Sequence, residues 1–127
     1  MDIKKVYISG KITGEDIHSV IRKFHDAARK IRRFGFEPVS PLDNGLPFPA
    51  AWEDHMGEDV KLLLKSDAIY LFPDYEQSKG ARLELTIAKE LGMPVFIEMP
   101  VAEIRMSGRD LASLIDRIGD SFCKARR

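Results

Sequence analysis

The chain has 127 residues, of which 44% are hydrophobic, so it is long enough to form one domain with a hydrophobic core. Twenty basic and twenty acidic residues give a formal net charge of zero, which argues against a nucleic-acid polymer or an anionic membrane as partner. The single cysteine, Cys123, excludes an internal disulfide framework and is typical of a reducing cytosol, so we expect a cytoplasmic protein. No apolar run approaches the ~18 residues of a membrane span, and the N-terminus lacks the pattern of a signal peptide.

Short apolar strands and amphipathic helices alternate along the chain. Each strand is a run of a few mostly apolar residues, and each helix carries apolar side chains at intervals of three and four. We expect strands at residues 5–9, 36–40, 68–72 and 94–98 and helices at residues 17–34, 52–65, 80–91 and 108–124. Gly35 follows the first helix as its capping residue, and Pro38 places the second strand at an edge of the sheet.

This alternation predicts an α/β fold with right-handed crossovers. We expect a single doubly wound parallel sheet, flavodoxin- or Rossmann-like, with strand order 2-1-3-4 and helices on both faces. That order brings the loops at residues 10–14 and 73–79 to one crevice at the carboxyl ends of the strands. Residues 1–100 would form this domain, and residues 101–127 would add an amphipathic helix that packs on the domain or on a partner subunit.

Two acids occupy helix faces on which apolar residues are expected. Glu84 lies on the same face as Ala81, Ile87, Ala88 and Leu91, and Asp59 lies among Trp52, Met56 and Leu63. The helix dipole offers a structural explanation for Glu84, which is in a first turn, but not for Asp59, which is in mid-helix. Two carboxylates in one crevice would have pKa values pushed apart, so that one stays ionised and the other carries a proton. Glycoside chemistry requires such a pair.

The loop at residues 10–14 is a candidate phosphate site. Gly10 and Gly14 let the backbone approach a ligand, although the loop is neither a Walker A loop nor a GxGxxG motif, and a plain structural turn is the alternative. Residues that offer phosphate contacts are Lys11, Thr13 and, at the start of the third expected helix, Ser78 and Gly80. On this basis we expect 5′-monophosphates to bind better than nucleosides, with Lys11 as the cation.

Taken in order, these residues resemble the nucleoside 2-deoxyribosyltransferase superfamily, including its branch of deoxynucleoside 5′-monophosphate N-glycosidases. The matching residues are Tyr7, Gly10, Ile12 and Gly14 (YxxGxIxG), Asp59 before an apolar strand, and Ser78, Gly80 and Glu84 (SxGxxxE). The chain looks most like the small bacterial and phage-borne members, and the similarity covers about residues 4–98. The loops at residues 41–51 and 72–77, which would choose the base, depart from the better-known members.

The resemblance implies a covalent deoxyribosyl intermediate on Glu84, help at the sugar and base from Asp59, and a Tyr7 hydroxyl that orients Glu84. It also implies substrate contacts from Ser78 and from the loop after the first strand, which we extend to Ser9. Asp74 is placed to read a base edge, and Trp52 either stacks on a base or packs in the core. The histidines lack metal-ligand spacing, so we expect no metal and no cofactor.

We therefore expect cleavage or transfer at the N-glycosidic bond of (deoxy)nucleosides or their 5′-monophosphates. The alternative is a catalytically silent nucleotide-binding module that uses the same crevice. A phosphoacceptor or metal-dependent phosphatase would need an acid at the end of the first strand, where Ser9 and Gly10 stand. The resemblance also implies a homodimer or a larger homo-oligomer.

Overall fold

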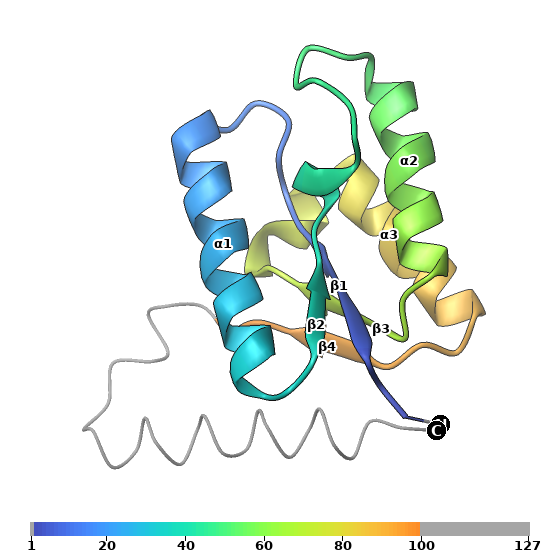
Figure 1. Cartoon of the computed structure of the whole chain (residues 1–127). Helices are drawn as coiled ribbons and strands as arrows, with labels where there is room; N and C mark the ends of the chain where they lie inside the picture. Colours follow the sequence, from blue (N-terminus) through green and yellow to red (C-terminus); the bar gives the residue numbers. More distant parts are fainter. Residues whose placement is uncertain (1, 100–127) are drawn as a thin grey trace.

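A computed structural model describes residues 2–99, which form a parallel sheet covered by helices on both faces (Figure 1). The strands are β1 (Lys5–Ser9), β2 (Glu37–Val39), β3 (Ala68–Leu71) and β4 (Val95–Ile97). The α-helices are α1 (Ile17–Arg33), α2 (Trp52–Leu64) and α3 (Lys79–Glu90). Two short 3-10 helices, η1 (Pro41–Asp43) and η2 (Pro73–Gln77), lie in the connections.

The strand order is β2-β1-β3-β4 and every pairing is parallel, which confirms the predicted fold class and topology. In the register, Tyr7 of β1 lies between Val39 of β2 and Ile69 of β3. From β1 the chain continues to β2 on one side of β1, and then to β3 on its other side. The direction in which strands are added to the sheet therefore reverses next to β1. This switch point, at the carboxyl ends of β1 and β3, is where open α/β sheets form a ligand crevice.

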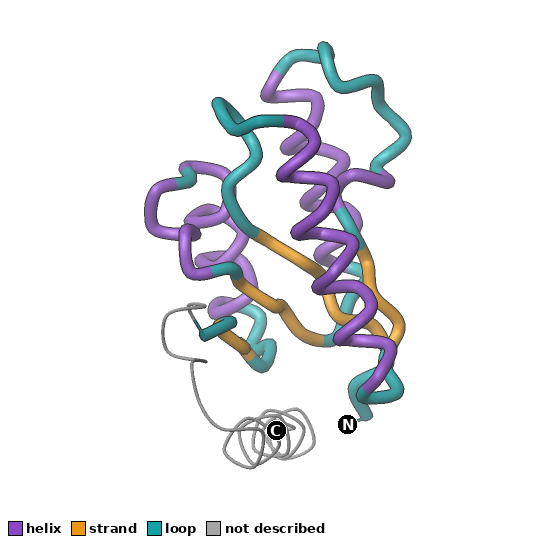
Figure 2. The backbone as a smooth tube through the Cα atoms, turned by 90° about the vertical axis from the view of Figure 1, so that its left-hand side faces the viewer, coloured by secondary structure: helices purple, strands orange, loops and turns teal. Residues whose placement is uncertain are grey.

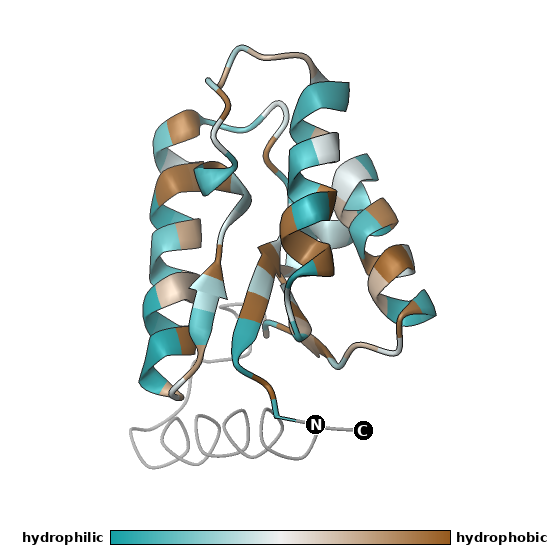
Figure 3. Cartoon of the chain, turned by 45° about the vertical axis from the view of Figure 1, so that its right-hand side comes forward, coloured by the Kyte–Doolittle hydropathy of each residue, from teal (hydrophilic) through white to brown (hydrophobic). Residues whose placement is uncertain are grey.

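The strands separate two apolar layers. Val6 and Ile8 of β1 point toward α1. They belong to a buried cluster that also includes Phe24, Ile31 and Phe72. Tyr7 belongs to the opposite layer, which packs under α2 and α3. Figure 2 shows α1 lying across the strands on its own face, and Figure 3 shows hydrophobic bands alternating with hydrophilic ones along the helices.

Local signals explain where α1 begins and ends. The side chain of Asp16 caps its first turn by accepting a hydrogen bond from the Ser19 amide. At its end the Gly35 amide bonds to the Arg32 carbonyl, the Phe36 amide bonds to the Ile31 carbonyl, and Gly35 has φ +88°. This is the Schellman arrangement that the position of Gly35 predicts.

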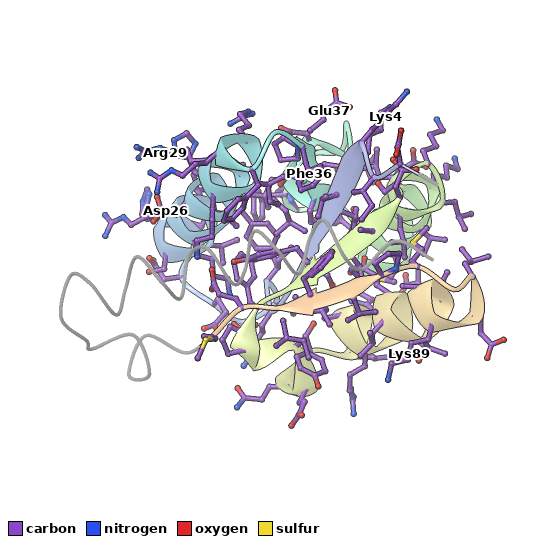
Figure 4. All side chains as sticks on the ribbon, turned by 90° about the horizontal axis from the view of Figure 1, so that it is seen from below. Lys4, Asp26, Arg29, Phe36, Glu37 and Lys89 are labelled. Carbon is purple, nitrogen blue, oxygen red and sulfur yellow. The ribbon has the colours of Figure 1, made fainter. Side chains whose placement is uncertain are left out.

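The amino-terminal edge of the sheet lies opposite the crevice. Figure 4 looks onto this edge and shows Lys4 and Glu37 there, with Arg29 of α1 and Lys89 of α3 pointing outward from opposite faces.

The predicted apolar faces of the helices need correction at Ile21 and Leu91, which are 48% and 55% exposed. The predicted helix at residues 108–124 and the unit at 101–127 lie outside the described residues. None of the helices within residues 2–99 is long and apolar enough to cross a membrane.

Candidate active site

Glu84 is buried in α3 with both carboxylate oxygens hydrogen-bonded. The Tyr7 hydroxyl donates to Oε2 at 2.8 Å, and the Ser9 hydroxyl donates to Oε1 at 2.7 Å. Tyr7 and Ser9 alternate with Ile8 in β1, so both point to the face that α3 covers. The start of α3 is set by Ser78, whose Oγ accepts a hydrogen bond from the Ala81 amide at 3.1 Å. Two elements distant in sequence thus hold one carboxylate in a defined orientation.

The environment of Glu84 disfavours its charge. Burial raises the pKa of Glu84 to about 7, the hydrogen bonds from Ser9 and Tyr7 oppose that rise, and the negative charge of Asp59 adds to it. Burial also raises the pKa of Tyr7 well above its ordinary value, and the charge of Glu84 reinforces this. Tyr7 therefore stays protonated and remains a donor to the carboxylate near neutral pH.

Asp59 supplies a second buried carboxylate, from α2, and is 7% exposed. Its Oδ1 accepts a hydrogen bond from Asn44 Nδ2 at 2.8 Å. Burial raises the pKa of Asp59 to about 6, whereas the bond from Asn44 and the nearby His55 lower it. The two acids thus have pKa values near the physiological range, as acid–base and nucleophilic groups require.

Both acids line one cavity of about 360 Å³ at the carboxyl ends of the strands. This volume lies at the lower end of the range for small-molecule sites. Its wall includes the apolar residues Ile12, Leu42, Leu46, Phe48, Trp52 and Met56. Glu15 is a third acid in the lining, and no lysine or arginine of residues 2–99 belongs to it. Within the same residues, no three His, Cys, Asp or Glu side chains are grouped to hold a metal ion.

Most of the predicted site residues meet at this cavity. Its lining contains Glu84, Asp59, Gly10, Ile12, Thr13, Gly14, Ser78, Gly80 and Trp52. Tyr7 and Ser9 are fully buried and reach the site through Glu84, so Ser9 supports the acid rather than lining the cavity. Trp52 also lies under a cation, since Lys79 Nζ is 4.5 Å from the centre of its ring.

Lys11 and Asp74 are placed differently from the prediction. The Lys11 amide donates to Asp74 Oδ1 at 3.0 Å, and Lys23 Nζ lies 2.6 Å from Asp74 Oδ2. Neither Lys11 nor Asp74 lines the cavity. Asp74 joins the loop after β1 and α1 to η2, and contact of the Lys11 and Asp74 side chains with a ligand stays a prediction.

The glycines of the loop after β1 have conformational and packing reasons to be there. A Cβ at Gly10 would lie 2.3 Å from Cδ2 of Phe72, so no side chain fits at that position. Gly14 has φ +81°, a conformation that other residues rarely adopt. Tight packing and turn geometry therefore account for both glycines, and the loop still brings its backbone to the cavity wall.

Two polar residues of the cavity were not predicted as functional. Asn44 follows η1 and bonds to Asp59, and its Nδ2 lies 2.9 Å from His55 Nδ1. Asn44 sits in an Asp-Asn-Gly turn within a long loop, and such turns carry no pattern that points to a site. His55 lies four residues before Asp59 on α2, a spacing that places both on one side of the helix.

Comparisons with known proteins agree with this architecture. Residues 4–97 match the family model described as "Domain of unknown function (DUF4406)". No curated protein matches the sequence significantly. A solved structure of the 2-deoxyribosyltransferase from the psychrotolerant bacterium Bacillus psychrosaccharolyticus is similar, with a TM-score of 0.57 and 22% identity over 73% of this chain and 70% of that chain. The chain therefore belongs to the DUF4406 family and has the α/β fold of a 2-deoxyribosyltransferase, as its resemblance to that superfamily implied.

Proposed function

We propose that the protein cleaves or transfers at the N-glycosidic bond of a nucleoside, with Glu84 as the nucleophile. The observation that carries the proposal is the pair of buried carboxylates, Glu84 and Asp59, in the lining of one cavity of about 360 Å³. A structural carboxylate is rarely buried in such a cavity without a cation, because burial penalises its charge. The hydroxyls of Tyr7 and Ser9 satisfy Glu84 without neutralising it, which keeps it available as a nucleophile.

In the proposed reaction, ionised Glu84 attacks C1′ of the sugar. The bond between C1′ and the base nitrogen breaks, its electron pair leaves with the base, and protonated Asp59 gives a proton to the base. The product of this step is a glycosyl ester on Glu84. Water or a second base then attacks C1′, the ester bond breaks, and the Asp59 carboxylate accepts the proton of the attacking group. Hydrolysis and transfer differ only in this second attacking group.

The charges at the cavity favour a neutral nucleoside over its 5′-monophosphate. Three carboxylates and no lysine or arginine among the described residues line the site, and the nearby cation of Lys79 lies over the ring of Trp52, so a phosphate would meet more negative than positive charge. This reverses the preference expected from the sequence, which depended on Lys11 as the phosphate cation. The apolar wall, with Trp52 and Phe48, suits the faces of a base.

The proposal is tested by incubating the protein with deoxynucleosides, ribonucleosides and their 5′-monophosphates and separating the free base by chromatography. A second free base in half of the reactions distinguishes transfer from hydrolysis. Glu84→Gln and Asp59→Asn should each lower base release by roughly 10²-fold or more, the scale of an acid–base group. The matched controls Glu90→Gln on α3 and Asp54→Asn on α2, both exposed, should behave as the wild type.

Three results would count against parts of this proposal. Undiminished release by Glu84→Gln would remove that residue as the nucleophile. If the wild type binds a nucleoside and neither it nor any variant releases the base, a catalytically silent binding module is supported instead. Preference for 5′-monophosphates would contradict the charge argument while leaving the chemistry intact.

A further inference from the structure

The side-chain amide of Asn44 has one stable orientation. Its Nδ2 donates to Asp59 Oδ1 at 2.8 Å and lies 2.9 Å from His55 Nδ1, while its Oδ1 accepts a hydrogen bond from the Leu46 amide at 3.0 Å. Turning the amide over would place Oδ1 against the Asp59 carboxylate and Nδ2 against the Leu46 N–H. The second contact sets one N–H against another and is repulsive whatever the protonation state of Asp59, so the amide nitrogen must face Asp59.

The same contacts fix the tautomer of His55. An amide nitrogen only donates, so His55 Nδ1 accepts and the ring proton sits on Nε2. His55 Nε2 lies 3.2 Å from the Phe48 carbonyl, to which it donates. A continuous chain of hydrogen bonds therefore links the Phe48 backbone, through His55 and Asn44, to Asp59. Because Leu46 and Phe48 line the cavity, this chain also ties the cavity wall to α2.

We propose that Asn44 is a positioning residue for Asp59, one that fixes the direction of its carboxylate and favours its ionised form. Nδ2 of Asn44 donates to Oδ1 of Asp59, and this hydrogen bond fixes the direction of the Asp59 carboxylate in the cavity that Asp59 lines. A donor to a carboxylate stabilises the charged form, consistent with the downward effect of Asn44 on the pKa of Asp59. The catalytic consequence rests on the proposed function, whereas the effect on the Asp59 titration does not.

A simpler role for Asn44 would be to form the turn with the Leu46 amide. Serine can form such a turn, as Ser40 does in this chain, where its Oγ accepts from the Leu42 amide at 3.2 Å. Serine Oγ takes about the place of Asn44 Cγ, one bond short of the Nδ2 that contacts Asp59 and His55, so a serine reaches neither. Asn44→Ser therefore keeps the turn and removes the contact with Asp59, whereas Asn44→Ala removes both.

The test compares Asn44→Ser, Asn44→Ala and the control Asp43→Ala, an exposed neighbour outside the cavity lining. Carbon-detected NMR follows the titration of the Asp59 carboxyl in the free protein, and base release gives kcat and KM. In both Asn44 variants the pKa of Asp59 should rise above its wild-type value, because a donor to the charged form is lost. The raised pKa alone would increase the protonated, active form of Asp59, so the lost direction of its carboxyl is what should lower kcat, roughly tenfold, less than on loss of the acid itself, with a smaller change in KM. Asp43→Ala should match the wild type.

A wild-type Asp59 titration in Asn44→Ser would overturn the proposal and leave Asn44 as a turn residue. Failure of both variants to fold would also overturn it, in favour of a role in folding. If Asn44→Ala alone fails to fold, Asn44→Ser decides, because it keeps the turn. If the wild type releases no base, the proposed reaction fails while the NMR titration still decides the role of Asn44.

Discussion

Replacing Glu84 by glutamine should make the free energy of unfolding of the protein less dependent on pH. Glutamine keeps the shape of the side chain, and its amide can accept from one of the hydroxyls of Tyr7 and Ser9 and donate to the other. The substitution therefore removes the ionisation of Glu84 while leaving its hydrogen-bond partners satisfied. Any change in the pH dependence of unfolding then reports the buried carboxyl itself.

The magnitude follows from the pKa of Glu84, which burial raises from 4.5 to about 7. Between these values the folded protein binds a proton that the unfolded chain has lost, so the free energy of unfolding falls as pH rises. The stabilisation is fully present below about pH 4.5 and is lost as pH rises through about 7. At about 1.4 kcal/mol per pKa unit, Glu84 should lower the wild-type free energy of unfolding by roughly 2–3 kcal/mol between about pH 5 and pH 8.

Urea unfolding followed by circular dichroism at pH 5 and pH 8 measures this effect. At each pH the free energy of unfolding of the wild type is subtracted from that of Glu84→Gln. This difference should be larger at pH 8 than at pH 5 by roughly 2–3 kcal/mol. Glu90→Gln, on the exposed side of the same helix, should show no comparable change. A difference between wild type and Glu84→Gln that stays constant with pH would refute a raised pKa for Glu84.

Other parts of the molecule give further predictions. Gly10→Ala should destabilise the protein by roughly 1–3 kcal/mol in urea unfolding, because the new Cβ would lie 2.3 Å from the Phe72 ring; an unchanged midpoint would mean that β1 moves at no cost. The rate of base release should be bell-shaped with a maximum between about pH 6 and 7, where the form with Glu84 ionised and Asp59 protonated is most populated, although the higher pKa of Glu84 makes this form a minor one; a rate that keeps rising above pH 8 would exclude Asp59 as the acid. The family resemblance predicts a homodimer or larger, and sedimentation at micromolar concentration that shows only a 14.4 kDa species would contradict it.

The fold could be predicted from the sequence because its signals are local. All strands but β2 are short, mainly apolar runs, and the first helix is closed by Gly35 with its Schellman hydrogen bonds. The two acids could be found for a related reason. A carboxylate on the apolar face of a helix breaks a periodic pattern, and Glu84 and Asp59 both break it.

The contacts that depend on the path of loops could not be predicted in the same way. Asn44 lies in a long loop without periodicity, so nothing in the sequence places its amide beside Asp59. The sequence predicts a phosphate contact for Lys11 because it is a cation in a loop with two glycines. The direction of a side chain in such a loop depends on backbone contacts, here the hydrogen bond from the Lys11 amide to Asp74.

The central claim, that Glu84 attacks the sugar, is tested most directly by looking for the glycosyl ester. Excess protein is mixed with a nucleoside that it cleaves, quenched in acid during a single turnover, digested and analysed by mass spectrometry. We predict the mass of the sugar on the peptide that contains Glu84 in the wild type and on no peptide of Glu84→Gln. Release of the base while that peptide keeps its unmodified mass throughout the turnover would contradict the account.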